Sequence, residues 1–303
     1  MSIKVNPVVK KIISVAGTTA LLWVLFEKTD KGEIHRQLSE FNLVEVFFTF
    51  GLYALSQVVS ALRMKVMFDG SVQLSAVKSV IIYFKSMFMS TFVPVGVGAE
   101  IYKSYYFHKM HHMDLKKAVK ASIAERISGL SALTFILILA YSIYLISTDQ
   151  ISPSLTVFAP VVLLSVLYIA VNLFSHVFSV LLVKATRLFL LSFCVQALQV
   201  ISFLFLISNT NAEIPLSLAA SVFFLTSLAS FVPLSFSGLG AREAVVLFLA
   251  GTYIFSPEPV VATTLVIGTY QVILSLCSGA FFLKKDRNSG RKNCSQALQN
   301  ASL

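Results

Sequence analysis

Long apolar stretches separated by short polar segments fill most of the chain. A helix that crosses a membrane needs about 20 predominantly apolar residues. Two stretches, Val80–Val93 and Leu216–Val232, run into Pro, then glycine-rich sequence, then a second short helical piece. The pattern predicts an all-α integral membrane protein with two broken or re-entrant helical hairpins and about six full spans. The predicted spans are Ile12–Phe26, Asn42–Leu62, Arg126–Ile146, Leu155–Val183, Leu188–Ile207 and Val260–Leu283.

Composition supports a membrane protein rather than a soluble one. Hydrophobic residues make up 56% and charged residues 13% of the chain, and the mean hydropathy is +0.82. Soluble domains carry about 25% charged residues, so many apolar side chains here are expected to face lipid. Residues 1–285 are predicted to form one polytopic membrane domain, and residues 286–303 a short disordered tail.

Lys and Arg are distributed unevenly between alternate loops. They gather before the first predicted span, after the second and fourth, before the third and after the last, whereas Thr148–Ser154, Ser208–Pro215 and Ser256–Pro259 contain none. Cytoplasmic loops of membrane proteins carry an excess of Lys and Arg. We therefore expect both termini in the cytoplasm and the chain in the inner (plasma) membrane. A net charge of +10 would suggest nucleic acid in a soluble protein, but this placement favours membrane topology and no nucleic acid partner is expected.

The two broken stretches resemble each other. Each reads Phe-Val-Pro, then Gly-x-Gly-Ala, then an acidic residue within one or two positions. Three full spans lie between them, and an odd number predicts that the copies point in opposite directions. Transporter folds place substrate sites where two such broken helices meet. Chance similarity of short apolar sequence is the alternative. The shared positions are Pro94, Gly96, Gly98 and Glu100 in one copy and Pro233, Gly238, Gly240 and Glu243 in the other.

This pattern is suited to holding an anion. Proline ends a helix, glycines allow a bend, and the exposed N–H groups of the next helix favour a phosphate. Arg242 adds a bidentate donor, and Glu100 and Lys103 share one helical face. The acids would neutralise basic partners or carry protons. For Arg242 and Glu243, a structural ion pair is the rival interpretation. For Glu125 and Arg126 two interpretations stay open, a contact with a lipid headgroup and a buried ion pair.

The segment Pro233-Leu-Ser-Phe-Ser-Gly-Leu-Gly-Ala-Arg-Glu243 resembles the P-x-S-x-x-G-x-G-x-R-E motif of the flippase-like domain family. That family includes the membrane region of lysylphosphatidylglycerol synthases, and the resemblance covers roughly residues 10–285. The family more often has Asp and Arg where Glu100 and Lys103 stand. The resemblance implies the following substrate-binding candidates: Arg63, Pro94, Gly96, Gly98, Glu100, Lys103, Glu125, Arg126, Pro233, Ser235, Ser237, Gly238, Gly240, Arg242 and Glu243.

The resemblance implies a lipid flippase or transporter-like protein. Its substrate would be an anionic phospholipid or a polyprenyl-phosphate-linked glycan used in envelope biogenesis. A non-transporting accessory subunit of a glycosyltransferase or lipid-modifying enzyme is the alternative, and oligomerisation stays open. About twenty polar residues follow the last span, so we expect no aminoacyltransferase domain and no enzyme activity.

No cofactor or metal is expected. The cluster of His108, His111 and His112 beside Asp114 is interpreted as a cytoplasmic surface group rather than a set of metal ligands.

Overall fold

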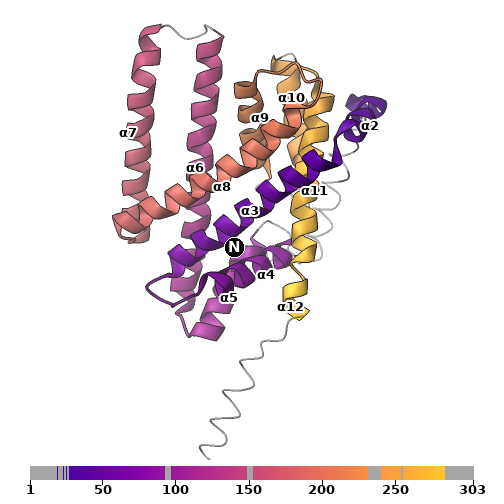
Figure 1. The fold of residues 1–303 in the computed structure, drawn as a ribbon. Helices are drawn as coiled ribbons and strands as arrows, with labels where there is room; N and C mark the ends of the chain where they lie inside the picture. Colours follow the sequence, from indigo (N-terminus) through magenta and orange to yellow (C-terminus); the bar gives the residue numbers. More distant parts are fainter. Residues whose placement is uncertain are drawn as a thin grey trace, which may run out of the picture.

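The computed structural model describes residues 19, 23, 25, 27–92, 97–148, 153–230, 240–253 and 255–283, and within these ranges it is helical with no strand. Figure 1 shows the helices arranged as one bundle. In chain order they are α2 Lys31–Glu40, α3 Leu43–Phe68, α4 Ala76–Phe92, α5 Gly98–His111, α6 Leu115–Ser147, α7 Pro153–Phe178, α8 Leu182–Ser208, α9 Leu216–Ala229, α10 Ala241–Tyr253, α11 Pro257–Cys277 and α12 Ala280–Leu283.

Four helical segments are long and apolar enough to cross a membrane, and the protein is therefore a multi-pass membrane protein. They are α3, α6, α8 and the combined segment Pro257–Phe282, while Ser165–Phe178 and Leu216–Ala229 are shorter apolar helices. At 1.5 Å per residue, the 33 residues of α6 measure about 50 Å. That length exceeds the roughly 30 Å of a bilayer's hydrocarbon core, so α6 must tilt or project beyond it.

The helix boundaries confirm some predictions and correct others. The predicted starts at Asn42 and Leu216 agree with α3 and α9. The described part of α4 extends to Phe92, and Pro94 lies outside the described residues. The predicted boundary between the spans Leu155–Val183 and Leu188–Ile207 is wrong, because α7 ends at Phe178 and α8 begins at Leu182. Ser179 adopts a positive φ of 54° in this turn, and no Pro or Gly marks it in the sequence.

Two further boundaries differ from the prediction. Helix α6 begins at Leu115, well before the predicted Arg126, because Asp114 caps it by accepting a hydrogen bond from the Lys117 N–H at 3.1 Å. The last predicted span is divided at Ser278–Gly279 into α11 and α12. The first predicted span and the tail lie almost wholly outside the described residues.

The two broken hairpins lie at opposite ends of the bundle. Helices α4 and α5 contact each other, and so do α9 and α10. In Figure 1 the α4–α5 pair lies at the lower end beside α12, and the α9–α10 pair lies at the upper end. The long helices α3 and α8 contact each other extensively and cross the bundle between the two pairs. The turns themselves, with Pro94, Gly96, Pro233, Ser235, Ser237 and Gly238, lie outside the described residues.

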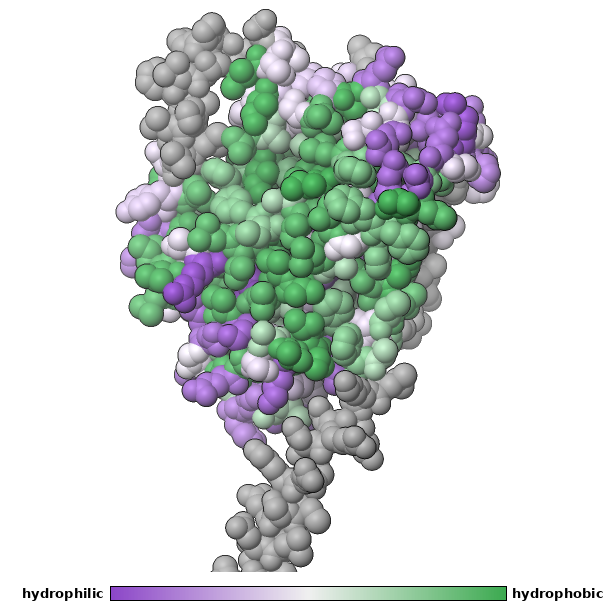
Figure 2. Space-filling model, in the orientation of Figure 1, coloured by the Kyte–Doolittle hydropathy of each residue, from purple (hydrophilic) through white to green (hydrophobic). Residues whose placement is uncertain are grey.

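Apolar side chains dominate the face shown in Figure 2, with hydrophilic residues at the two ends. Inside, one hydrophobic cluster surrounds Phe203, Phe223 and Phe224, and a second surrounds Met64, Phe68 and Phe107. The rings of Phe68 and Phe107 stack with centroids 3.8 Å apart and join α3 to α5. These contacts fix the position of α5, which carries three of the predicted site residues, Gly98, Glu100 and Lys103.

Helix α2 is polar and lies at the hydrophilic upper right of Figure 2. Its N-cap Asp30 accepts hydrogen bonds from the N–H groups of Gly32 and Glu33. Arg36 and Gln37 donate hydrogen bonds to the Glu33 carboxylate, which lowers the pKa of Glu33. This helix therefore belongs to the polar boundary of the protein rather than to its apolar band.

Candidate functional site

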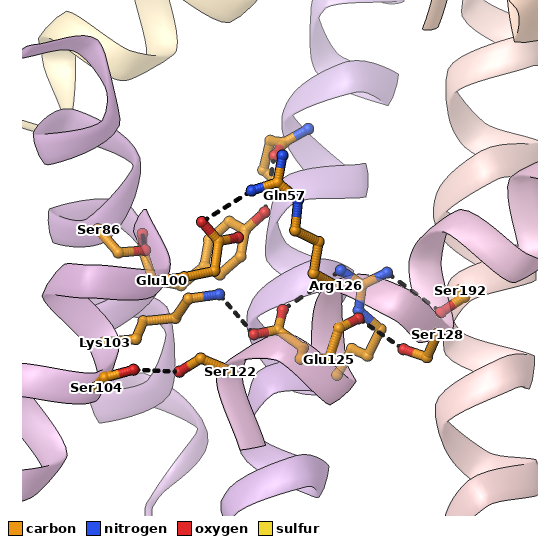
Figure 3. Close-up of polar contacts among 12 residues, drawn as sticks. Gln57, Ser86, Glu100, Lys103, Ser104, Ser122, Glu125, Arg126, Ser128 and Ser192 are labelled. Carbon is orange, nitrogen blue, oxygen red and sulfur yellow. Dashed lines mark hydrogen bonds and ion pairs between the residues drawn. The ribbon is translucent and has the colours of Figure 1, made fainter. Parts of the chain in front are cut away.

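Buried charged side chains meet where α3, α5 and α6 converge (Figure 3). Glu125 of α6 lies at the centre and is only 1% exposed. Its Oε2 accepts a hydrogen bond from Lys103 Nζ at 2.6 Å, and its Oε1 accepts one from Arg63 Nη2 at 3.3 Å. One carboxylate thus binds two cations. Lys103 is 3% exposed, so it is not a solvated surface lysine.

A second ion pair continues this arrangement. Arg126 Nη1 lies 3.2 Å from Glu100 Oε2. Glu100 and Lys103 share one face of α5, as predicted, and their partners are consecutive residues of α6. We call Arg63, Glu100, Lys103, Glu125 and Arg126 the basic cluster; three cations against two carboxylates leave it with one surplus positive charge.

Neighbouring side chains hold the cluster in place. Arg63 Nη1 donates to the Ser192 hydroxyl at 3.2 Å, and Ser104 donates to Ser122 at 3.1 Å. Tyr83 donates to Gln57 Oε1 at 3.3 Å. Among the described residues the Nε of Arg63 is buried with no hydrogen-bond partner. The guanidinium therefore has unused donor capacity in a site that holds it from two sides.

Gly129 leaves room for that guanidinium. A Cβ added at this position would lie 2.7 Å from Arg63 Nη1, closer than two such atoms can approach. The tip of an arginine is flexible, but here it is held by Ser192 and Glu125. Displacing it would weaken both contacts.

We expect Gly129→Ala to lower the free energy of unfolding by about 1–3 kcal/mol, because the added methyl group forces Arg63 away from its partners. Gly251→Ala is the matched control, since a Cβ there meets nothing within 4 Å. Both changes favour helix formation by up to about 1 kcal/mol, so their difference isolates the clash. Denaturant titration in mixed micelles measures both variants, and equal stabilities would show that Arg63 moves freely.

A seam of buried polar side chains runs from the cluster along the contact between α3 and α8. Gln199 donates to the Ser56 hydroxyl at 3.1 Å, and Ser202 donates to the Thr49 carbonyl at 3.0 Å. Thr49 also shares a 2.8 Å hydrogen bond with Tyr270 of α11. Hydrogen bonds of this kind join helices in membranes. The seam holds together the two helices that cross between the broken hairpins.

The second charged centre lies at the start of α10. Arg242 is 8% exposed, and its Nη2 donates to Gln271 Oε1 at 2.8 Å. Its Nε is buried without a partner in the described parts of the chain. No carboxylate there lies within 4.0 Å of the guanidinium. The rival ion pair with Glu243 or Glu100 is therefore not formed in this structure, and Glu100 binds Arg126 instead.

The Glu243 side chain caps the N-terminus of its own helix, α10. Its Oε2 accepts a hydrogen bond from the Gly240 N–H at 2.7 Å, while its Oε1 has no partner in the described part of the chain. A Glu three residues into a helix often caps the first N–H group in this way. Gly240 has φ +85°, a conformation that glycine adopts without strain. Gly240, the last residue of the predicted bend before α10, thus has the backbone conformation that such a bend requires.

Sequence reasoning missed the uncharged members of both centres. Ser192 accepts a hydrogen bond from Arg63 of the basic cluster, and Gln271 binds Arg242. Polar side chains inside membrane helices are costly and often functional, so their positions in apolar stretches were the signal that could have found them. No hydrogen bond or ion pair joins Arg242 to the basic cluster in the described ranges.

The histidines do not form a metal centre in the described structure. No group of three or more His, Cys, Asp or Glu side chains is arranged to hold a metal among those residues. His108 Nδ1 lies 2.9 Å from the Met113 carbonyl, which closes the end of α5. Partial burial and nearby Lys78 lower the pKa of His111.

Comparison with known proteins identifies one family. The family model described as the lysylphosphatidylglycerol synthase TM region matches residues 11–279. That range contains both charged centres and both broken hairpins. No curated protein matches the chain.

Proposed function

Since the chain belongs to the lysylphosphatidylglycerol synthase transmembrane-region family, whose proteins are related to lipid handling, we propose that it moves an anionic lipid across the membrane. The substrate class is an anionic phospholipid or a polyprenyl-phosphate-linked glycan, and the setting is envelope biogenesis at the inner membrane. The phosphate of the headgroup is the part that the protein recognises.

The observation that carries this proposal is that the buried charge of Arg242 forms no ion pair among the described residues. A charged side chain in the membrane costs roughly 2.5–3.5 kcal/mol on insertion scales, and a positive charge at a helix start opposes the helix dipole. Arg242 bears these costs without a carboxylate partner among the described residues, and its Nε is unused. A phosphate would compensate the charge and accept from the free donor.

The arrangement of the broken hairpins supports an inverted repeat. The α4–α5 pair and the α9–α10 pair lie at opposite ends of the bundle, and each brings charged residues to the start of its second helix. We propose six full spans together with these two hairpins. A lipid headgroup would then meet the basic cluster from one face and Arg242 from the other.

The test is lipid scrambling by the purified protein in liposomes that contain no other protein. Fluorescent phosphatidylglycerol in the inner leaflet is expected to become accessible to a quencher faster than in protein-free liposomes. Unchanged rates with folded protein would contradict the proposal and favour the accessory subunit, whose partner would be a glycosyltransferase or lipid-modifying enzyme.

The proposed topology places both termini in the cytoplasm. In a variant whose native cysteines are replaced by serine, Asn209→Cys is expected to react with an impermeant thiol reagent from outside intact cells. Ser71→Cys, in the loop between α3 and α4, is expected to react only after the cells are opened. Both positions are exposed, so accessibility of the side chain is matched. External labelling of Ser71→Cys would overturn the topology.

A further inference from the structure

Glu243 is a buried carboxyl group, 0% exposed. Among the described residues its Oε2 accepts a hydrogen bond from the Gly240 N–H, and its Oε1 has no hydrogen-bond partner. No Lys, Arg or His nitrogen in the described ranges lies within 4.0 Å of either oxygen. The other buried carboxylate, Glu125, binds two cations. Unlike Glu125, Glu243 therefore has no ion pair in the described structure that would stabilise its charged form.

The described helices that contact α10 place no counter-ion within 4.0 Å of Glu243. Helix α10 contacts α9, which has no ionisable side chain, and α11, whose ionisable side chains are Glu258, Tyr270 and Cys277. On α10 itself Arg242 and Tyr253 are ionisable, and Tyr253 bonds to Tyr141 of α6.

The nine residues that precede α10 and Gly240, 231–239, contain no ionisable residue. The Thr264 hydroxyl donates to the Val261 carbonyl. Arg242 is thus the cation whose field acts on Glu243.

Opposing effects act on the protonation of Glu243. Burial favours the neutral acid, whereas the helix N-terminus, the Gly240 N–H and the neighbouring charge of Arg242 favour the carboxylate. A phosphate bound to Arg242 would cancel the last of these contributions and add a like charge. Loss of the phosphate would restore it. Occupancy at Arg242 therefore determines which form of Glu243 is favoured.

We propose that Glu243 takes up one proton on Oε1 when an anionic lipid phosphate binds at Arg242, and releases it when the phosphate leaves. This inference rests on the proposed function and adds proton coupling to it. The Gly240 N–H stays bonded to Oε2 in both states, so the helix cap is kept while Oε1 changes. Because linkage is reciprocal, a lower pH strengthens phosphate binding and a bound phosphate strengthens proton binding.

The first experiment measures the affinity of the full-length protein for phosphatidylglycerol in nanodiscs between about pH 5 and pH 8. This lipid is a phosphodiester, so it avoids the second ionisation of phosphate monoesters near pH 6. Wild-type affinity is expected to rise as pH falls, by up to about tenfold per pH unit for one coupled proton. Glu243→Gln keeps an oxygen for the Gly240 N–H, mimics the neutral acid and should bind tightly at every pH.

Glu258→Gln, in the first turn of α11, is the matched control and should keep the wild-type pH dependence. If the wild-type protein binds no phosphatidylglycerol at any pH, the proposed function fails and the coupling fails with it. If it binds and Glu243→Gln retains the same pH dependence, only the proton inference is overturned.

Infrared difference spectroscopy tests protonation without lipid binding. The lipid-free protein is expected to show a buried carboxylic acid C=O band that titrates with pH, is lost in Glu243→Gln and is kept in Glu258→Gln. Adding phosphatidylglycerol should shift this titration to higher pH. A band that survives in Glu243→Gln, or one that lipid leaves unmoved, would overturn the inference.

Discussion

Replacing Glu125 by glutamine is expected to lower the free energy of unfolding by about 3–5 kcal/mol, the largest effect on stability that the structure predicts. The change leaves Lys103 and Arg63 buried without their shared carboxylate. The surplus charge of the basic cluster rises from one to two. Glutamine keeps the size of the side chain, so the loss reports charge rather than a cavity.

A double-mutant cycle separates this effect from a general sensitivity of α6. Lys103→Met alone is expected to cost less, because Arg63 still compensates Glu125. The double variant Lys103→Met with Glu125→Gln should recover part of the stability lost in Glu125→Gln. Glu40→Gln, which breaks an exposed ion pair on α2, should cost less than about 1 kcal/mol. Additive losses in the cycle would show that the two residues do not share their charges.

The helical architecture could be predicted from sequence because lipid and backbone chemistry impose strong patterns. Apolar length identified α3, α6, α8 and α11. Pro94 predicted a helix end at Val93, and the described part of α4 extends to Phe92. The turn between α7 and α8 could not be located in this way. It lies within a continuous apolar run, and Ser179 adopts the left-handed conformation without a glycine. Hydropathy reports that a stretch is apolar but not where it reverses direction.

Charge partners were harder to predict than helices. The sequence correctly indicated that Glu100 and Lys103 share a face, since that follows from helical periodicity. Their partners depend on how α5 packs against α6, and this rotation is set by contacts such as the stack of Phe68 on Phe107. Glu125 and Arg126 therefore form ion pairs with Lys103 and Glu100 of α5. Whether a lipid headgroup also reaches them stays a prediction.

The two charged centres differ in a way that separates stability from function. In the basic cluster each carboxylate has a cation within 3.3 Å, so these residues hold α3, α5 and α6 together. At α10 the guanidinium and the carboxyl group are neighbours in sequence but do not pair. A charge whose removal breaks no ion pair is the better candidate for a ligand contact. Arg242 is that residue.

Arg242→Lys and Arg242→Gln are expected to impair lipid transport without reducing stability. Lysine keeps the charge but loses the bidentate fork. Losing one charged hydrogen bond of about 1.5–3 kcal/mol corresponds to a roughly tenfold to hundredfold drop in transport. Glutamine loses the charge as well and should reduce transport further. Because the buried guanidinium forms no ion pair among the described residues, the thermal unfolding midpoint of Arg242→Gln should equal that of the wild type or lie above it.

Two arginine variants make this prediction specific. Arg126→Gln breaks the pair with Glu100, so its unfolding midpoint should fall. Arg187→Gln removes an exposed arginine of α8 and should change neither stability nor transport. Scrambling rates in liposomes are compared with unfolding midpoints in detergent for all four variants. If Arg242→Gln lost stability in step with transport, its charge would have a structural partner. If both Arg242 variants transported lipid at the wild-type rate, the guanidinium would not be the phosphate ligand.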